Sequence, residues 1–485
     1  MRRLLVAAVL SGALVTTNAA ERRITRLDGS RTTAAEIDAT VQRLMRAGQV
    51  SGLGLAILND RRVAYLKAYG ERDTKKHLPL TIDSVMTSAS FSKSTFAFMV
   101  MQLVQEGVLD LDATVQRYLT RPLPEYPDYK DLAGDERYQR ITLRMLLSHT
   151  AGFPNLRVLN MGRLNINFEP GSRYAYSGEG IRLLQLVVEE VMHRPAQALM
   201  QERVFRRFGM ARTSMVWEPA FESDFANGYD EYGRSFGPQR RRRPDAAGSM
   251  KTTLADFSRF VEAVARGRGL DAPTRALMLR PQIAIRSRTQ FPTLSTETTD
   301  RNAAIALSYG LGWGVFSTPV GPAFFKEGHD DGWQHYVVVF DKPGTGIVIM
   351  SNSSNGEGIF QALLKQVIGN TYTPIEWEGY APYDQRPPLA PLPEHRAIVL
   401  DADVLDRYVG RYRAEGQLSW TIARRGDRLT LTEDGDPDAL VLTPESELTF
   451  FANPIDGRVT FERDDRDRVV ALRMLRWPGR FVRVE

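Results

Sequence analysis

The sequence predicts an α+β protein in which an antiparallel sheet is flanked by helices, followed by a separate small all-β barrel. Three observations lead to this prediction. Strand-like patterns stand at both ends of the first domain with helical patterns between them, a proline-rich stretch follows, and the chain then continues as short alternating runs. At 485 residues the chain exceeds what one hydrophobic core usually organises. More than one domain is therefore expected.

The first domain is expected to span residues 34–373. Apolar periodicity of about 3.6 predicts helices, and alternation predicts strands. In chain order these are a helix at 37–47, strands at 53–59 and 62–69, an apolar helix at 96–104 closed by Gly107, a buried helix at 181–192, and strands at 336–340 and 347–350.

The stretch 374–396 contains several prolines, a composition that favours an extended, semi-rigid linker. Residues 397–485 are then expected to form the β domain. Its predicted strands are the short runs 420–423, 428–431, 439–442, 448–451, 458–463 and 469–475.

Residues 1–20 have the pattern of a cleaved signal peptide. Arg2 and Arg3 precede an apolar run at 4–15, and small residues follow at 17–20. A membrane anchor is the alternative, but a spanning helix needs about 20 apolar residues and this run is shorter. We expect a periplasmic or secreted protein with no stable membrane span after cleavage.

The composition excludes several classes of function. Cysteine is absent, which rules out disulfides, thiolate metal sites and a cysteine nucleophile. The net charge of +5 is spread over a long chain, so no nucleic-acid partner is expected. The one short basic run, 240–243, is interpreted as a solvated loop, with binding of anionic envelope polymers as the alternative.

The strongest chemical signal is Ser90-Phe91-Ser92-Lys93, the only Ser-x-x-Lys in the chain, where a polar loop enters the apolar helix. At this spacing Ser90 and Lys93 share one helical face, with about 5 to 6 Å between Cβ atoms, so the amine can reach the hydroxyl. The helix N-terminus adds a positive end that stabilises an alkoxide. Alone, the motif also fits a serine cap followed by a surface lysine.

Two further polar clusters accompany this motif. Pro170-Gly171 leads into Tyr174-Ala175-Tyr176-Ser177-Gly178, and Lys326-Glu327-Gly328 stands at the head of a predicted strand. Lysine is scarce beside arginine in this chain, so a second lysine in such a cluster is notable. The three clusters, in this order, fit one known kind of site.

On these residues the chain resembles the serine β-lactamase and penicillin-binding protein family, in its class C β-lactamase-like form, over about 37–370. The segments 109–112, 141–152 and 246–250 are similar to that family as well. The resemblance implies a β-lactamase/transpeptidase-like sheet with an all-helical subdomain. The segment 405–412 resembles the start of the lipocalin-like β domain appended to some members.

The resemblance also implies roles for individual residues. Ser90 would be the nucleophile, Lys93 its general base and Tyr176 the proton shuttle to the leaving group. The backbone N–H groups of Ser90 and His329 would form the oxyanion hole. The residues implied in substrate binding are Lys326, Gly328, His329, Ser177 and Gly178, and no cofactor or metal is implied.

The chemistry of the residues agrees with these roles. A serine hydroxyl is too weak a nucleophile without a base, and a lysine serves as base only if burial and nearby cations depress its pKa. Lys326 is the candidate for that neighbouring cation, and it can also bind a substrate carboxylate.

Two departures from the family pattern concern specificity. Gly178 stands where the family usually has an asparagine whose amide binds substrate, and Glu327 replaces a hydroxyl that helps hold a substrate carboxylate. Both count against efficient β-lactamase activity and leave the acylation machinery intact. We expect an asparagine at position 178 to raise any activity on peptides or β-lactams.

Four other features of the sequence have simpler interpretations. Gly233-Arg234-Ser235-Phe236-Gly237 matches a hydrolase elbow but lacks the strand and helix that an elbow needs, so a surface turn is preferred. Metal-ligand side chains also occur together, at His329, Asp330, Asp331 and His335. They follow directly on the Lys326-Glu327-Gly328 cluster, so a metal site is not preferred. His149 is interpreted as a structural residue near the site, and Tyr174 as a weaker candidate than Tyr176.

The sequence thus predicts an exported serine hydrolase that acts through an acyl-Ser90 intermediate. Its substrates would be small molecules or peptides with amide or ester bonds, including D-amino-acid peptides, β-lactam-like compounds and cell-wall fragments. The alternatives are a carboxylesterase or acyltransferase without penicillin activity, and a non-catalytic protein that binds cell-wall peptides.

Overall fold

The structure is a computed structural model that describes residues 23–484 except 161, 415–418, 434–437, 453–456 and 476. The predicted signal peptide, residues 1–20, lies outside the described residues. Across the described ranges, no helix is both long enough and apolar enough to cross a bilayer.

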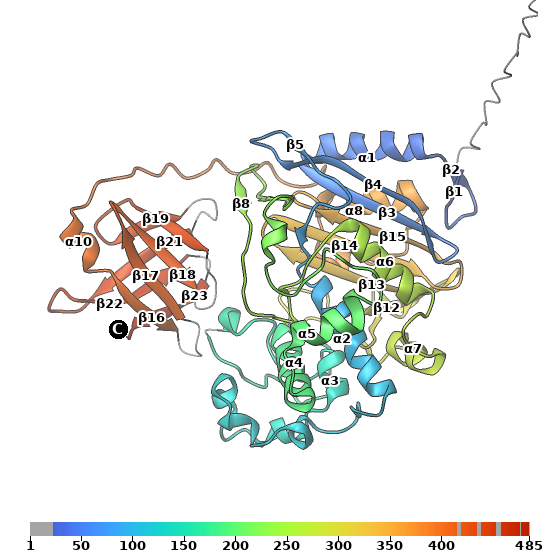
Figure 1. The fold of residues 1–485 in the computed structure, drawn as a ribbon, viewed down its shortest axis with the longest axis horizontal. Helices are drawn as coiled ribbons and strands as arrows, with labels where there is room; N and C mark the ends of the chain where they lie inside the picture. The colour runs from blue at the N-terminus through green and yellow to red at the C-terminus, as the bar shows by residue number, and fades with distance from the viewer. Residues whose placement is uncertain are drawn as a thin grey trace, which may run out of the picture.

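A nine-stranded antiparallel sheet forms the centre of the first domain and confirms the predicted α+β class (Figure 1). Strand β15 pairs with β3, so segments almost 300 residues apart meet at the middle of the sheet. Its strands, from one edge to the other, are β10 (Ile283–Ala284), β11 (Ser308–Tyr309), β12 (Gly314–Thr318), β13 (Gly321–Asp330), β14 (Trp333–Phe340), β15 (Thr345–Ser351), β3 (Gly52–Asn59), β4 (Arg62–Asp73) and β5 (Leu78–Pro79).

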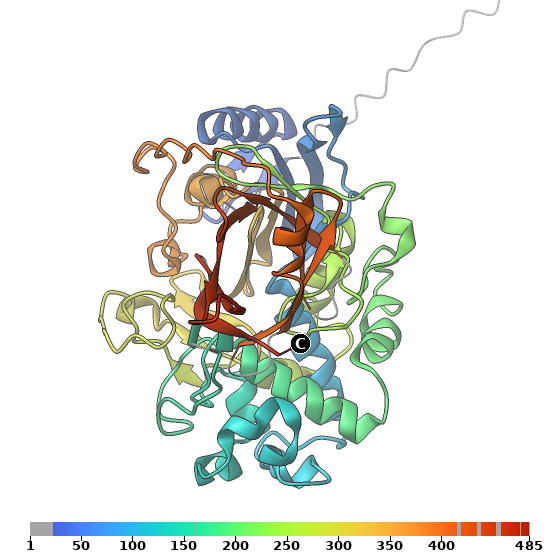
Figure 2. The same cartoon turned by 90° about the vertical axis from the view of Figure 1, so that its left-hand side faces the viewer.

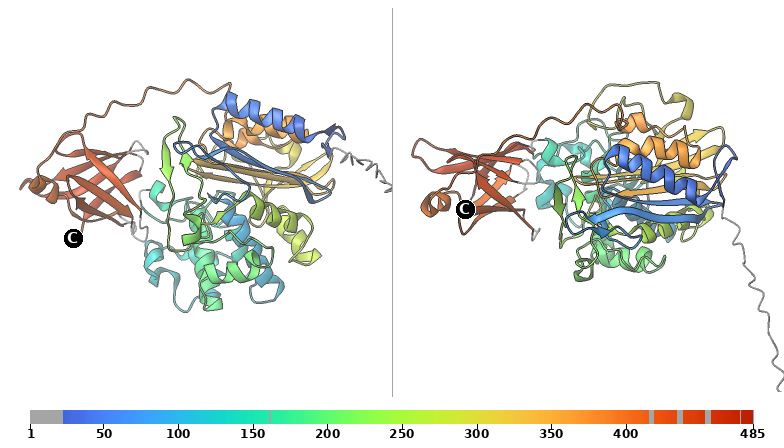
Figure 3. Two further views of the ribbon diagram at one scale, coloured as in Figure 1. Left: turned by 45° about the horizontal axis from the view of Figure 1, so that its top comes forward. Right: turned by 90° about the horizontal axis from the view of Figure 1, so that it is seen from above.

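Helices cover both faces of this sheet. Helices α1 (Ala34–Gly48) and α8 (Glu357–Ile368) lie side by side on one face (Figure 3). Helices α2 (Phe91–Gln105) and α6 (Leu254–Ala265) lie on the other. Because both faces are covered, the central strands β14 and β15 are buried along their whole length, and burial does not alternate.

In the sequence, the helical subdomain stands between strands β3–β5 and strands β10–β15, which pair into one continuous sheet. The subdomain contains α3 (Leu143–Leu147), α4 (Gly178–Met192), α5 (Ala196–Met200) and several 3-10 turns, with α7 (Ala272–Leu279) beyond it. The predicted helices 96–104 and 181–192 are α2 and α4, and each begins several residues earlier, directly after Ser90 and Ser177. Gly107, with φ at +73°, follows the C-cap of α2.

Three small two-stranded sheets complete the first domain. They pair β1 (Ile24–Thr25) with β2 (Arg31–Thr32), β6 (Met86–Thr87) with β9 (Lys251–Thr252), and β7 (Gly228–Tyr229) with β8 (Ser235–Gly237). The β6–β9 pair matters most, because the chain passes from β6 directly into the Ser90 motif.

The connector starts later than the proline pattern indicated. Helix α9 (Ile375–Glu378) lies inside the expected linker, yet Ile375 and Trp377 are buried in the core beside α8. Beyond Gly379 the chain runs without regular structure to α10 (Ala402–Asp406).

Residues after the connector form a closed eight-stranded barrel, which is seen end-on in Figure 2. Six of its strands match the predicted runs, and the first and last complete the closure. In order they are β16 (Gly410–Ala414), β17 (Ser419–Arg425), β18 (Arg428–Glu433), β19 (Ala439–Pro444), β20 (Thr449–Ala452), β21 (Gly457–Arg463), β22 (Val469–Met474) and β23 (Trp477–Arg483).

Among the described residues, the barrel contacts the first domain in at least two regions. Strand β23 lies against the 3-10 helix η5 (Arg157–Asn160). Arg240 donates from its backbone N–H to Asp438 Oδ2 at 2.6 Å and from Nη1 to Oδ1 at 2.9 Å, while Nε and Nη2 bind Glu222. The basic run was expected to be a solvated loop. Instead, its first arginine joins the two domains.

Candidate active site

Ser90 stands at the junction between strand β6 and helix α2. Ala89 before it has φ at +48°, an unusual conformation for a residue with a side chain. Ser90 occupies the N-cap position of α2, yet its side chain makes no capping hydrogen bond. Its Oγ instead accepts a hydrogen bond from Lys93 Nζ at 3.0 Å. The hydroxyl is therefore hydrogen-bonded to the Lys93 amine and does not cap a backbone N–H of the helix.

Lys93 is buried at 3% exposure one turn along α2. Its Nζ donates to Ser90 Oγ and, at 2.5 Å, to the backbone oxygen of Ala247. Burial, followed by the positive charge of Lys326, lowers the pKa of Lys93 to about 7, against opposing effects of Asp245 and Glu327. A large fraction of this amine is therefore neutral, and able to accept a proton, near neutral pH.

Tyr176 lies between the two lysines. Lys326 Nζ donates to its hydroxyl at 3.0 Å, and the Nζ atoms of Lys93 and Lys326 lie 5.0 and 4.8 Å from its ring centroid. Burial and the charge of Glu327 raise the pKa of Tyr176 well above its ordinary value. The tyrosine is therefore a neutral hydroxyl linking the two amines.

Lys326 lies in the middle of strand β13, not at its head as the sequence indicated. Strand β12 pairs with β13 only as far as Phe325. From Lys326 to Asp330, β13 pairs with β14 on one side, and its β12 side has no partner strand among the described residues. The fully buried Nζ also donates to Glu327, at 3.0 Å to the backbone oxygen and 2.5 Å to Oε1. The charges of this lysine and this glutamate are thus paired with each other.

Gly328 and His329 continue this edge. A Cβ on Gly328 would lie 3.0 Å from the backbone oxygen of Ser88, so the glycine lets β13 approach the nucleophile loop closely. The His329 ring is half exposed and pairs through Nδ1 with Glu357 at 2.7 Å. Although burial opposes protonation, Glu357 raises the pKa of His329 to about 9. Its imidazole is thus held by α8.

Ser177 and Gly178 form the start of helix α4. Ser177 Oγ accepts from the Gly180 N–H at 2.9 Å and donates to the Pro154 oxygen at 2.8 Å, which commits the hydroxyl to capping. A Cβ on Gly178 would lie only 2.9 Å from the backbone oxygen of Asn155. Any side chain at 178 must therefore displace that backbone oxygen, a steric cost that the prediction of higher activity for an asparagine there does not include.

His149 supports the site without contacting Ser90. Its Nδ1 accepts the Ser177 N–H at 3.3 Å, and its ring lies 4.5 Å from that of Tyr176 and 4.8 Å from that of Tyr309. Burial and the charges of the two lysines lower the pKa of His149 well below its usual value. Tyr174 packs against Tyr309, while the hydroxyl that binds Lys326 belongs to Tyr176.

Ser235 and the His–Asp cluster form no further site. Ser235 is an exposed residue of the short strand β8, with no helix after it. His335 uses both ring nitrogens within the fold, one with the Thr87 oxygen and one with the Ser351 N–H. Within the described ranges, no group of three or more potential ligands is arranged to hold a metal ion.

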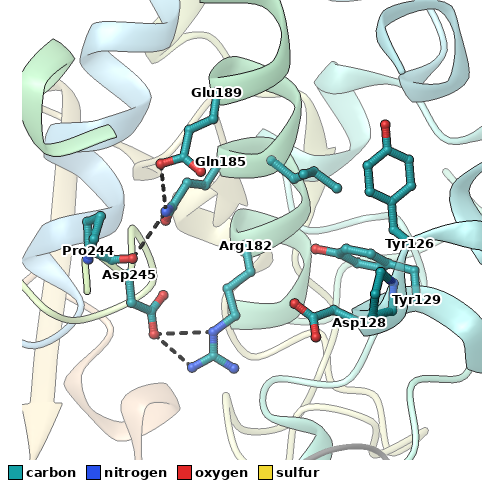
Figure 4. Close-up of a pocket in the computed structure, with 10 residues that line it drawn as sticks. Tyr126, Asp128, Tyr129, Arg182, Gln185, Glu189, Pro244 and Asp245 are labelled. Carbon is teal, nitrogen blue, oxygen red and sulfur yellow. Dashed lines mark hydrogen bonds and ion pairs between the residues drawn. The ribbon is translucent and has the colours of Figure 1, made fainter. Parts of the chain in front are cut away.

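The sequence did not indicate the ion pair that positions the backbone of Ala247. Arg182 on α4 donates to Asp245 at 2.8 Å, and Asp245 Oδ1 accepts the Ala247 N–H at 2.9 Å (Figure 4). A cavity of about 350 Å³ borders this pair, with Tyr126, Asp128 and Tyr129 on its opposite wall. The segment 246–250 resembles the family in sequence, but no side chain in it signals a contact made by a carbonyl.

Glu378 was also missed, because it lies within the expected linker. It is buried, and neither side-chain oxygen has a hydrogen-bond partner in the described part of the chain. Burial and the nearby charge of Glu327 raise its pKa well above the ordinary value. The raised pKa favours the uncharged form of Glu378, so the negative charge paired with Lys326 is that of Glu327.

Comparison with known proteins identifies the family. The family model described as Beta-lactamase matches residues 37–368, and one described as Domain of unknown function (DUF3471) matches residues 394–481. The chain therefore belongs to the beta-lactamase family and carries an additional C-terminal domain. This confirms the resemblance found from the three motifs.

Individual relatives are distant. Penicillin-binding protein 4* of Bacillus subtilis is 22% identical over 440 residues, which cover 82% of this chain and 87% of that protein. The octameric penicillin-binding protein homologue from Pyrococcus abyssi has a TM-score of 0.58 at 20% identity and covers 93% of this chain and 100% of that one. D-alanine carboxypeptidase AmpC from Burkholderia cenocepacia has a TM-score of 0.55 at 20% identity, with 69% and 98% covered. These two structures show a shared fold.

The state of Lys93 predicts the pH dependence of acylation. Only the neutral amine accepts a proton, so kcat/KM should rise with pH, by about tenfold per unit below pH 7, and level off above it. Initial rates with a p-nitrophenyl ester from pH 5 to 9 would measure this. A profile that is flat, or that falls as pH rises through 7, would contradict the assignment of Lys93 as base.

Proposed function

We propose that the protein is an exported serine hydrolase that works through an acyl-Ser90 intermediate. The observation that carries this proposal is the 3.0 Å hydrogen bond from the buried Lys93 amine to Ser90 Oγ. A serine whose hydroxyl touches a lysine with a pKa of about 7 has the base that nucleophilic attack requires.

The reaction follows from the positions of these groups. Neutral Lys93 takes the Ser90 proton as Oγ attacks the substrate carbonyl carbon. The backbone N–H groups of Ser90 and His329, the pair that the family resemblance implies, stabilise the oxyanion. Tyr176, hydrogen-bonded to Lys326, delivers a proton to the leaving group as its bond breaks. Water then attacks the acyl carbon and gives a proton to the Tyr176 phenolate oxygen. The bond from the acyl carbon to Oγ breaks, protonated Lys93 returns its proton to Ser90 Oγ, and the acid is released.

The paired charges of Lys326 and Glu327 support substrates without a free carboxylate at this position. An unpaired lysine would attract a carboxylate, but Glu327 Oε1 lies 2.5 Å from Nζ in a fully buried pair. Esters and uncharged amides therefore fit better than penicillins. We include acylated D-amino-acid peptides among the proposed substrates. One relative is named a penicillin-binding protein, and one similar structure is named a D-alanine carboxypeptidase.

Mass spectrometry after incubation with a fluorescent penicillin and, separately, with a p-nitrophenyl ester tests this proposal. We expect rapid ester hydrolysis and slow or incomplete labelling of Ser90 by the penicillin. A stable penicillin adduct without ester turnover would indicate a penicillin-binding type. Neither adduct nor product from either compound would support the non-catalytic binding protein instead.

Substitution of Glu327 tests the charge argument for specificity. Glu327→Thr should free the charge of Lys326 and raise the rate of penicillin acylation at least tenfold, while ester hydrolysis changes little. Glu297→Thr, which alters an exposed carboxylate, is the matched control. An unchanged or slower penicillin reaction in Glu327→Thr would show that Glu327 does not oppose a carboxylate.

A further inference from the structure

The space where a side chain at position 178 would lie is filled by other residues. The atoms nearest to a Cβ on Gly178 are the Asn155 backbone oxygen at 2.9 Å, Asn155 Oδ1 at 3.4 Å and Ala247 Cβ at 3.5 Å. Asn155 belongs to the loop before η5, 23 positions away in the chain. A carboxamide is therefore present at this corner of the site, although the motif at 176–178 lacks one.

The hydrogen bonds of Asn155 fix the orientation of that carboxamide. Gly178 N–H donates to Oδ1 at 3.1 Å and to the Asn155 backbone oxygen at 3.0 Å, which also accepts Glu179 N–H at 3.1 Å. A backbone N–H only donates, so the side-chain oxygen must face Gly178 and the Nδ2 group must point away from it. Asn155 is half-buried, and no described residue accepts a hydrogen bond from Nδ2.

Both sides of Asn155 are anchored. The preceding Pro154 oxygen accepts from Ser177 Oγ at 2.8 Å, and Arg157 N–H donates to Glu179 at 2.9 Å. On the other side, Ala247 places its methyl group beside Gly178 and its carbonyl on Lys93. The amide thus contacts Gly178, which lies against the residue whose carbonyl binds Lys93. Because the amide is held in place, little conformational entropy is lost when it binds a ligand.

We propose that Asn155 is a specificity-determining residue, whose Nδ2 group donates a hydrogen bond to an amide carbonyl in the acyl part of the substrate. This inference rests on the proposed acyl-Ser90 chemistry and narrows its substrates. It favours N-acylated amino-acid esters and peptides over simple aliphatic esters. Glycine at 178 is then required for this position of Asn155. Its missing side chain leaves room for Asn155, and its N–H binds the amide oxygen.

Two esters that share a leaving group separate recognition from chemistry. The p-nitrophenyl ester of N-acetyl-D-alanine carries an amide carbonyl, and p-nitrophenyl propionate has none. Asn155→Asp keeps the oxygen that accepts from Gly178 and removes the donor, and Asn155→Ala removes the whole group. Rates are measured at pH 9, where Lys93 is neutral even if a new charge raises its pKa somewhat.

We expect both variants to lower kcat/KM for the N-acetyl ester about tenfold or more, mainly through KM, and to leave the propionate ester within about twofold. Asn160→Asp, in which the altered amide binds the Arg163 oxygen, should change neither. Equal losses on both esters, or no loss on the N-acetyl ester, would overturn the inference. A wild-type protein inactive on both esters would overturn the proposed function itself, and this inference with it.

Discussion

Replacing Ser90 with alanine is expected to abolish ester hydrolysis and labelling by penicillin together. Without Oγ no acyl-enzyme forms, and the loss of kcat should reach at least about 10⁴-fold, as expected when the nucleophile of a serine hydrolase is removed. The fold should survive, because the Ser90 side chain makes no capping bond and its hydroxyl contacts only side chains of the site, those of Lys93 and Tyr176, among the described residues. Intact-protein mass and p-nitrophenol release measure both effects.

Ser94→Ala is the matched control for this variant. Ser94 lies on the same helix and is buried, but its hydroxyl donates to the Phe91 backbone oxygen at 3.0 Å. Its loss should cost about 1 kcal/mol of stability and leave acylation largely intact. If Ser90→Ala retained wild-type turnover, another residue would have to be the nucleophile.

Lys93→Arg is expected to lower acylation by about 10³-fold or more although the positive charge is kept. A guanidinium stays protonated and cannot accept the Ser90 proton. Lys326 is not a substitute base, because its amine is held by Tyr176 and Glu327. The test compares the rates of ester hydrolysis by Lys93→Arg and by the wild type above pH 7, where wild-type Lys93 is mostly neutral.

A larger side chain at a site with 3% exposure can disturb folding, so Lys93→Met provides a second variant. Methionine fills a similar volume without charge, so this variant should be at least as stable as the wild type and equally inactive. Lys130→Arg, at an exposed lysine, is the control. Wild-type acylation by either Lys93 variant would remove Lys93 from the role of base.

The sequence predicted the sheet, the main helices and the barrel because each depends on local periodicity. It also indicated the grouping of Ser90, Lys93, Tyr176 and Lys326, which the structure brings within hydrogen-bonding or ring-contact distance. The first two are one helical turn apart, so their contact follows from spacing. The other two were associated with them only through the family resemblance.

Other parts of the site could not be predicted because they depend on tertiary contacts. The Ala247 oxygen is a backbone atom, and nothing in Ala246-Ala247-Gly248 distinguishes it from any other carbonyl. Asn155 lies in a loop whose position is set by α4, so its proximity to Gly178 has no periodic signal. Proline content suggested that the linker begins at residue 374, but Trp377 is buried, and burial of a single aromatic residue outweighs composition.

The contact between Arg240 and Asp438 has a consequence for how the two domains associate. Both side chains are about one third exposed, so the ion pair alone is weak and is screened by salt. The connector nevertheless keeps the barrel at an effective concentration of the order of millimolar beside its partner surface. Docking is therefore an intramolecular equilibrium: diluting the protein leaves the fraction of docked barrels unchanged, whereas raising the ionic strength lowers it.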